Sequence, residues 1–252
     1  MKPVKDIALA FAFLTRIPVR HEDGDASPGA LARAMWAFPL VGIFVGAASG
    51  LTLLLALAIG LPPFIAATLA VAASVLLTGG LHEDGLADLA DAAGGATRER
   101  RLEIMKDSRI GSYGVIALML ALLLRIGALS AFATAESALT LLALLAAAAA
   151  VSRAAIICIA FALPHARPGG LSALAGRPTG GIAFAAAAVA LLPCLALAPP
   201  TILAGLAGTG LAAFAIWSIA RKWLGGQTGD VLGACQQAAE IGFLLGALAV
   251  SH

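Results

Sequence analysis

Two long stretches without any acidic or basic residue constrain this chain most. Residues 34–81 contain none in 48 positions, and residues 178–220 contain none in 43. Each stretch is long enough for two membrane-crossing helices, since one crossing takes about 20 residues. Pro-Pro pairs at 62–63 and 199–200 divide the two stretches, and such a pair cannot continue a helix. The sequence therefore predicts two helical hairpins.

Composition extends this prediction to the whole chain of 252 residues. It is 61% hydrophobic and 12% charged, against about 45–50% and about 25% in soluble domains. The 16 basic and 14 acidic residues give a net charge of only +2, which argues against nucleic acid as a partner. We expect a single integral membrane domain over residues 1–252, an all-α bundle in the lipid bilayer with an interfacial helix within residues 2–19. The seven predicted spans are 36–59, 64–81, 112–134, 138–163, 180–198, 201–220 and 231–250.

The basic residues predict the orientation of the bundle. Fourteen of the 16 fall in segments that share one side of the membrane, and the predicted hairpins on the other side hold none. By the positive-inside rule, this places the N-terminus and any active site on the cytoplasmic face of the cell membrane. The other two, Arg125 and Arg153, lie inside spans, where we expect them to pair with Glu136 and Glu240 or to snorkel.

An acidic segment follows the second span. Residues 82–109 hold 12 of the 30 charged side chains. Asp84, Asp88 and Asp91 are spaced i, i+4 and i+7, so they share one face of a helix. Because like charges repel, the stripe favours a divalent cation, and carboxylate ligands favour Mg²⁺ or Mn²⁺ over zinc. The competing interpretation is an ordinary acidic helix start, which the helix dipole tolerates.

A basic segment precedes the next span. Lys106 and Arg109 could donate to phosphate oxygens, and Gly111 and Gly114 leave the backbone open near a helix N-terminus, where amides favour anions. The same cations would also serve membrane topology.

A glycine-rich segment, Gly225–Asp230, opens the last span. Thr228 or Asp230 could cap that helix, or could bind a sugar or a phosphate through a metal ion. Acidic, basic and glycine-rich segments on one face together favour phosphoryl transfer, in which cations neutralise phosphate charge and a nucleophile is aligned. The active-site segment is expected at about residues 78–114.

Five motifs carry a resemblance to a known family. They are Phe13–Pro18, Phe38–Gly42, Thr78–Asp91, Met105–Gly114 and Gly225–Asp230, in this order. The chain resembles the cobalamin (5'-phosphate) synthases, also called adenosylcobinamide-GDP ribazoletransferases. The resemblance implies that a ribose hydroxyl of α-ribazole, or of its 5'-phosphate, attacks adenosylcobinamide-GDP and releases GMP.

The resemblance also implies roles for individual residues. The metal ligands would be Glu83, Asp84, Asp88 and Asp91. Asp84, Asp88 and Lys106 would take part in catalysis, with Asp88 as a candidate to accept the hydroxyl proton. The substrate-binding residues would be Arg16, Asp107, Ser108, Arg109, Gly111, Gly114, Thr228 and Asp230.

Two other classes of protein agree less well with the sequence. A CDP-alcohol phosphotransferase would need an Arg where Asp88 follows Ala87, and its later Gly and Asp spacing is also missing. A transporter would need broken helices and a site at the membrane midplane, whereas most charges here are expected at one surface. Gly42, Gly46 and Gly50 permit close helix contact, within one chain or in a homo-oligomer.

Overall fold

The protein is an all-helical bundle, as predicted. The computed structural model describes residues 3–19 and 29–251, which are about 80% helical and contain no β-strand. Two of the basic residues assigned to the cytoplasmic side, Lys2 and Arg20, lie outside the described residues. The helices are α1 (Pro3–Leu14), α2 (Ala30–Ala34), η2 (Met35–Ala37), α3 (Phe38–Ala58), α4 (Pro63–Thr78), α5 (Leu81–Asp91), η3 (Ala92–Gly94), α6 (Arg98–Ile104), α7 (Ser112–Ala135), α8 (Ala138–Ala162), α9 (Leu171–Ala175), α10 (Gly180–Ala190), η4 (Pro193–Ala196), α11 (Pro199–Leu224) and α12 (Gly229–Leu248).

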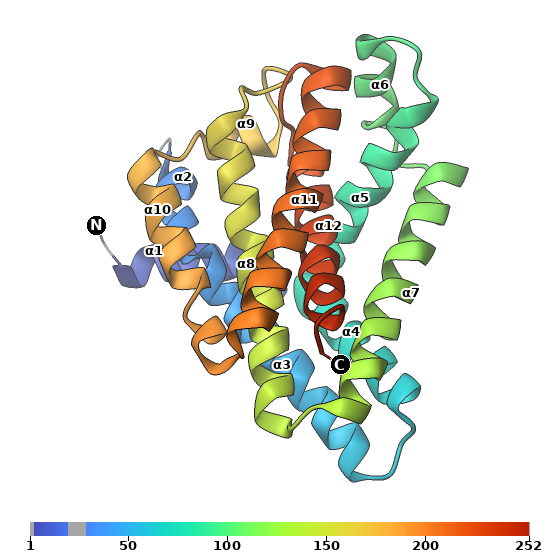
Figure 1. The fold of residues 1–252 in the computed structure, drawn as a ribbon. Coiled ribbons are helices and arrows are strands. Elements are labelled where there is room, and N and C mark those ends of the chain that lie inside the picture. The colour runs from blue at the N-terminus through green and yellow to red at the C-terminus, as the bar shows by residue number, and fades with distance from the viewer. Residues whose placement is uncertain (1–2, 20–28, 252) are drawn as a thin grey trace.

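Helix α8 forms the centre of the bundle. It runs through the middle of Figure 1, with α10 to one side and α7 to the other, and 89% of its most apolar window is buried by other parts of the protein. It packs mainly against α3 and α12. The side chains of the alanine run at 146–150 are small, so neighbouring helix backbones can approach α8 closely.

Glycines of α3 make the closest of these contacts. A Cβ atom at Gly42 would lie 2.4 Å from the carbonyl oxygen of Ala149, and one at Gly46 would lie 2.3 Å from that of Leu145. Both distances are far below a normal contact. The glycine spacing noted in the sequence is therefore used within one chain, between α3 and α8.

This contact gives a first testable prediction. Gly46→Ala should lower the free energy of unfolding by about 1–3 kcal/mol, because the new methyl group meets backbone that cannot move aside. Gly127→Ala in α7 is the matched control, since a Cβ atom there meets nothing within 4 Å. Thermal unfolding of both variants in detergent checks this. Equal stability of the two variants would contradict the close α3–α8 contact.

Within residues 3–19 and 29–251, five helices are long and apolar enough to cross a membrane. They are α2 to α3 taken together (Ala30–Ala58), α7, α8, α11 and α12. Helices α4 and α5 could add a sixth crossing, but they meet at an angle of 91°. The polytopic helical bundle is therefore confirmed, with five or six candidate spans where about seven, plus or minus one, were predicted.

Two predicted spans are not straight crossings. The span at 64–81 corresponds to α4, which qualifies only together with α5, and the span at 180–198 is interrupted. Helix α10 ends at Ala190, and η4 begins at Pro193 after a turn. Proline lacks the amide hydrogen that a helix interior needs, and its ring clashes with the preceding turn. The 17 residues from Gly180 to Ala196 therefore form a short interrupted segment rather than a straight crossing.

The N-terminal helix α1 does not cross the bundle lengthwise. It lies across α2 and α3 in Figure 1. Its Asp6 is fully buried and accepts hydrogen bonds from Arg33 Nε at 3.1 Å and from Trp36 Nε1 at 3.2 Å. A short helix fixed in this way agrees with the predicted non-spanning N-terminal segment.

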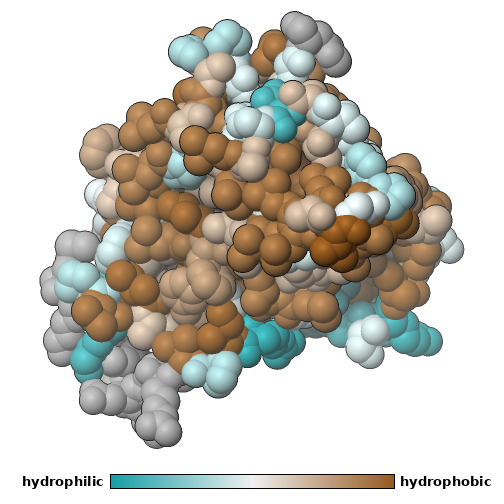
Figure 2. Space-filling view, turned by 90° about the horizontal axis from the view of Figure 1, so that it is seen from below, coloured by the Kyte–Doolittle hydropathy of each residue, from teal (hydrophilic) through white to brown (hydrophobic). Residues whose placement is uncertain are grey.

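The polar loops meet at one end of the bundle, whereas the opposite end is largely apolar. Arg98 at the start of α6 donates to the carbonyl oxygens of Leu224 and Ala166. Gln227 exchanges backbone hydrogen bonds with the 164–166 segment. Figure 2, which shows the bundle from below, presents a predominantly hydrophobic surface. The segments predicted to share one face of the membrane therefore do lie together.

Candidate active site

A break between α4 and α5 determines where the acidic residues of α5 lie. Gly79 and Gly80 have φ angles of 67° and 71°, a left-handed conformation that glycine adopts without strain. This double turn produces the 91° bend and directs α5 toward the polar end of the bundle. Arg16 lies against the turn, because its backbone amide donates to the carbonyl oxygen of Leu77 at 2.8 Å and its side chain fills the space beside Gly79.

Close packing against α12 brings a second acidic segment to α5. A Cβ atom at Gly85 would lie 2.8 Å from the backbone oxygen of Asp230, and Gly233 approaches the same turn of α5. Asp88 consequently interacts electrostatically with both Asp84 and Asp230. We call Asp84, Asp88 and Asp230 the acidic cluster. The structure thus unites two of the three segments singled out in the sequence.

One cation lies near this cluster and was not predicted as a site residue. Arg167 Nη2 lies 3.8 Å from Asp230 Oδ2, and the guanidinium also interacts electrostatically with Asp88. Its Nη1 is buried without a hydrogen-bond partner among the described residues. The loop that carries Arg167 is held beside Thr228 by the pairing of Ala166 with Gln227. No local motif marks Arg167, so sequence reasoning had only its positive charge as a signal.

Asp91, predicted as a metal ligand, binds the start of α7 instead. Its two carboxylate oxygens accept the backbone N–H groups of Gly111 at 2.7 Å and Gly114 at 2.8 Å. Those are the amides that the sequence assigned to a substrate anion. An acidic side chain at a helix N-terminus satisfies the unpaired amides of the first turn, so Asp91 has a structural role at α7. The roles predicted for Asp91 toward a metal ion and for the two amides toward a substrate stay predictions.

Asp91 therefore gives a second prediction. Asp91→Asn retains one acceptor oxygen for the α7 amides and should lower the free energy of unfolding by about 1 kcal/mol, the usual size of a capping effect. Its turnover should remain within about tenfold of the wild type. Melting curves and initial rates, measured side by side, check this. A complete loss of turnover at unchanged stability would restore Asp91 to the metal site.

Thr228 has the capping role that the sequence left open. Its hydroxyl accepts the backbone N–H of Val231 at 3.3 Å and donates to Asp230 Oδ2 at 3.2 Å. Thr228 therefore orients a member of the acidic cluster, and this arrangement gives it no free donor toward a substrate.

The basic segment forms an exposed loop between α6 and α7. Lys106, Ser108 and the Asp107–Arg109 pair are all exposed. Arg109 Nη2 donates to Asp107 Oδ2 at 2.7 Å, and hydrogen bonds from Arg109 lower the pKa of Asp107 to about 2. The pair therefore stays ionised at neutral pH. Asp107 and Arg109 line an open pocket together with Asp91, which places them next to the end of α5.

Glu83 faces away from the acidic cluster. Its Oε1 accepts from Arg125 Nη1 at 3.1 Å and from Gln237 Nε2 at 3.0 Å. Successive residues of a helix point about 100° apart, so Glu83 and Asp84 serve different sides of α5. In this structure Oε1 of Glu83 is bound by Arg125 and Gln237, and the metal role of Glu83 stays a prediction.

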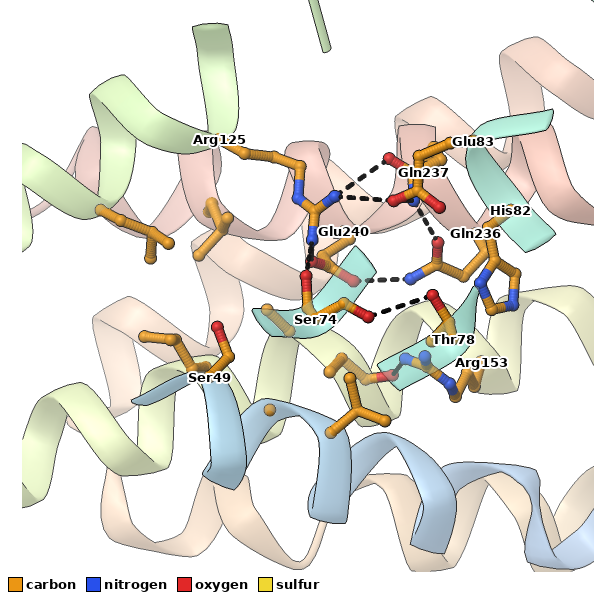
Figure 3. A pocket seen from close by; sticks show the side chains of 17 residues that line it. Ser49, Ser74, Thr78, His82, Glu83, Arg125, Arg153, Gln236, Gln237 and Glu240 are labelled. Atoms are coloured by element: carbon orange, nitrogen blue, oxygen red, sulfur yellow. Dashed lines mark hydrogen bonds and ion pairs between the residues drawn. The ribbon is translucent and has the colours of Figure 1, made fainter. Parts of the chain in front are cut away.

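Glu83 belongs to a buried polar chamber beneath α5, shown in Figure 3. Arg125 Nη2 forms an ion pair with Glu240 Oε1 at 2.9 Å, so one of the two arginines does pair with Glu240. Arg153, only 1% exposed, instead donates to the carbonyl oxygen of Ala149. Polar residues that line the chamber include Ser74, His82, Glu83, Arg125, Arg153, Gln236, Gln237 and Glu240.

The chamber bears on the transporter alternative. The chain does have buried charges inside its spans, as expected, and also a broken helix, which the sequence analysis did not predict. However, the free space in the chamber is only about 20 Å³, roughly the room of one water molecule. Its charges are also paired or bound to backbone, so the network locks α5 onto α7 and α12.

The arrangement of acidic side chains bears on the predicted metal site. Within residues 3–19 and 29–251, no three His, Cys, Asp or Glu side chains form a group that could by itself hold a metal ion. The acidic cluster nevertheless offers hard oxygen ligands that Arg167 compensates only in part. That donor set fits Mg²⁺, which is commonly bound by one or two carboxylates together with substrate phosphates.

Comparison with known proteins identifies the family. The family model described as cobalamin-5-phosphate synthase matches residues 6–248. A protein of Bradyrhizobium diazoefficiens is 48% identical, over 98% of this chain and 94% of its own. One of Azorhizobium caulinodans is also 48% identical, over 96% and 95%. Both relatives are named adenosylcobinamide-GDP ribazoletransferase.

No solved structure matches this chain. With a match over almost its whole length, the chain belongs to the cobalamin-5-phosphate synthase family.

Proposed function

We propose that the protein is an adenosylcobinamide-GDP ribazoletransferase of the cytoplasmic membrane. It would transfer the cobinamide-phosphate group of adenosylcobinamide-GDP to α-ribazole or α-ribazole 5'-phosphate. The observation that carries this proposal is the meeting of Asp84 and Asp88 with Asp230 at the bend between α4 and α5, in a chain of this family.

The reaction balances as a single displacement at phosphorus. The ribose hydroxyl oxygen forms a bond to the phosphorus on the cobinamide side, and the bond from that phosphorus to the bridging oxygen breaks. GMP leaves with the bridging oxygen, and the hydroxyl proton passes to a carboxylate. We assign that proton to Asp88, which lies between Asp84 and Asp91 on α5 and interacts with Asp230 across the helix contact.

Mg²⁺, with Mn²⁺ as the alternative, is the proposed cofactor. Asp84 and Asp230 would hold it together with substrate phosphate oxygens, which leaves Asp88 to accept the hydroxyl proton. When bound, the ion would supply positive charge that offsets the charge on the pyrophosphate. The protein adds cations of its own, since Lys106 and Arg109 lie on the loop beside the end of α5, and Arg167 lies beside Asp230.

We place the polar end of the bundle and the N-terminus on the cytoplasmic side. The support is the concentration of Arg98, Arg100, Arg101 and Lys106 at that end, in agreement with the positive-inside rule. Chemical labelling tests this, because a single cysteine replacing exposed Ser108 should react with a membrane-impermeant thiol reagent only in inverted vesicles. Labelling in right-side-out vesicles would reverse the proposed orientation.

The activity is tested with purified protein in liposomes. Supplied with adenosylcobinamide-GDP, α-ribazole 5'-phosphate and Mg²⁺, the protein should release GMP. Omitting the acceptor or adding EDTA should stop the release, and restoring Mg²⁺ should recover it. Release that persists in EDTA would contradict the metal proposal. The absence of any release from folded wild-type protein would contradict the activity.

A further inference from the structure

An apolar cavity adjoins the acidic cluster and is not used by the chemistry described above. Its volume is about 130 Å³. It lies where the end of α1, helix α2 and the start of α3 face α5, α8 and α12. Asp84 and Asp230 form part of its wall. The rest is mostly apolar, with Phe13, Leu14, Leu31, Met35, Phe38 and Ile156 as its main lining residues.

The aromatic side of this cavity is rigidly built. The rings of Phe13 and Phe38 are stacked, with centroids 6.0 Å apart and planes 17° apart. Phe38 is 2% exposed and Met35 is 3% exposed, so both side chains are fixed by surrounding atoms. A preformed pocket with a stacked aromatic wall favours a flat ring system, because offset stacking adds to the gain from apolar burial.

We infer that this cavity binds the heteroaromatic base of the acceptor nucleoside. This inference rests on the proposed function, whose substrates carry four flat groups. The corrin ring is far too large for the cavity, since sites for drug-sized ligands already measure about 300–1,000 Å³. Guanine and the adenine of the adenosyl ligand have polar edges, and the six main lining side chains offer these edges no hydrogen-bond partner. The base of a ribazole, a small benzimidazole-type ring system, has the matching size and polarity.

The position of the cavity also matches the direction of the reaction. A base stacked on the partly exposed ring of Phe13, with the buried Phe38 and Met35 behind it, would leave its ribose on the side of Asp84 and Asp230, which belong to both the cavity wall and the acidic cluster. The attacking hydroxyl would thus be delivered to the carboxylates by the binding of the base. Phe38 and Met35 act in this account as residues that determine specificity.

Binding and kinetics of matched phenylalanine variants test the inference. Phe38→Leu should raise the dissociation constant of α-ribazole 5'-phosphate, measured without donor, by about five- to tenfold through the loss of stacking and contact area. The KM for this acceptor should rise similarly, while the KM for adenosylcobinamide-GDP stays within about twofold. Phe132→Leu is the control, because Phe132 is equally buried at 1% exposure but does not line the cavity.

A second variant changes specificity instead of affinity. Met35→Ala enlarges the cavity. The ratio of kcat/KM for an acceptor nucleotide with a three-ring base to kcat/KM for α-ribazole 5'-phosphate should therefore rise by about tenfold, the usual effect of pocket contacts of this size. Met105→Ala, with a methionine that is 4% exposed and outside the cavity, should leave that ratio unchanged. This ratio compares two acceptors on one folded enzyme, so it does not depend on the stability of the variant.

The outcomes separate this inference from the proposed function. Wild-type protein that binds the acceptor through Phe38 but releases no GMP would leave the cavity assigned and overturn the activity. Normal turnover with an unchanged acceptor KM in Phe38→Leu and an unchanged ratio in Met35→Ala would overturn the inference. Variants that alter the dependence on lipid, but not on the acceptor, would overturn it in favour of an acyl chain.

Discussion

Replacing Asp88 with asparagine is expected to lower kcat about 10²–10⁴-fold, the range associated with the loss of a general base. The exchange keeps the shape of the side chain and removes its charge beside Asp84 and Asp230. Stability should not fall, because Asp88 interacts mainly with other carboxylates, and removing one charge relieves their repulsion. Initial rates of GMP release and a melting curve of the same preparation measure both effects.

Glu99→Gln serves as the control for Asp88→Asn. Glu99 is an exposed acidic residue of α6 with only a long contact of 3.9 Å to Arg98, so the same chemical change there should leave kcat within about twofold, as for most surface substitutions. An Asp88→Asn variant that keeps more than a tenth of wild-type kcat would remove Asp88 from the proposed chemistry. A variant that fails only by unfolding would mean that the carboxylate is structural.

Arg125→Met is expected to have the largest effect on stability. Arg125 is 4% exposed and bonds to Glu83, Glu240 and Ser74, so its loss leaves two buried carboxylates unpaired. Breaking a buried ion pair by removing one partner typically lowers the free energy of unfolding by about 3–5 kcal/mol. Thermal unfolding in detergent should therefore show a strong decrease in Tm, together with a loss of turnover as α5 loses its anchor.

A double variant separates charge from packing at this position. Combining Arg125→Met with Glu83→Gln removes one charge of each sign and leaves Glu240 to compensate the buried Arg153. It should recover most of the lost stability, because well-packed neutral replacements of buried ion pairs are often tolerated. Recovery of turnover in the double variant would confirm that the network positions α5. If Arg125→Met alone were as stable as the wild type, the chamber would not anchor α5.

The apolar helices could be predicted from the sequence because their signals are local. The charge-free stretches identified α3 and α11, apolar runs with one or two charges identified α7, α8 and α12, and the Pro-Pro pairs placed the turns before α4 and α11. The polar segments at 78–114 and 225–230 were expected to lie together, and α5 does pack against the start of α12 at Gly85 and Asp230. Here the spacing of Asp84 and Asp88 along a helix was sufficient, since both lie on α5.

The remaining features depend on tertiary contacts that no local pattern contains. Glu83 and Asp84 are neighbours in the chain, yet the rotation of α5 against α12 decides which of them faces Arg125 and which faces Asp230. The capping of α7 by Asp91 requires the end of α5 to meet Gly111, 20 residues later. One miss was avoidable, because Pro193 lies inside the predicted span at 180–198 and marks the point where its helix breaks.

The proposed transfer is tested most directly by mass spectrometry of the product. Wild-type protein with adenosylcobinamide-GDP, α-ribazole 5'-phosphate and Mg²⁺ should form one corrinoid that contains the ribazole, with one GMP released for each product molecule. EDTA and Asp88→Asn should abolish both signals together. Formation of adenosylcobinamide phosphate in place of the joined product would mean hydrolysis instead of transfer, and it would contradict the role assigned to the acidic cluster.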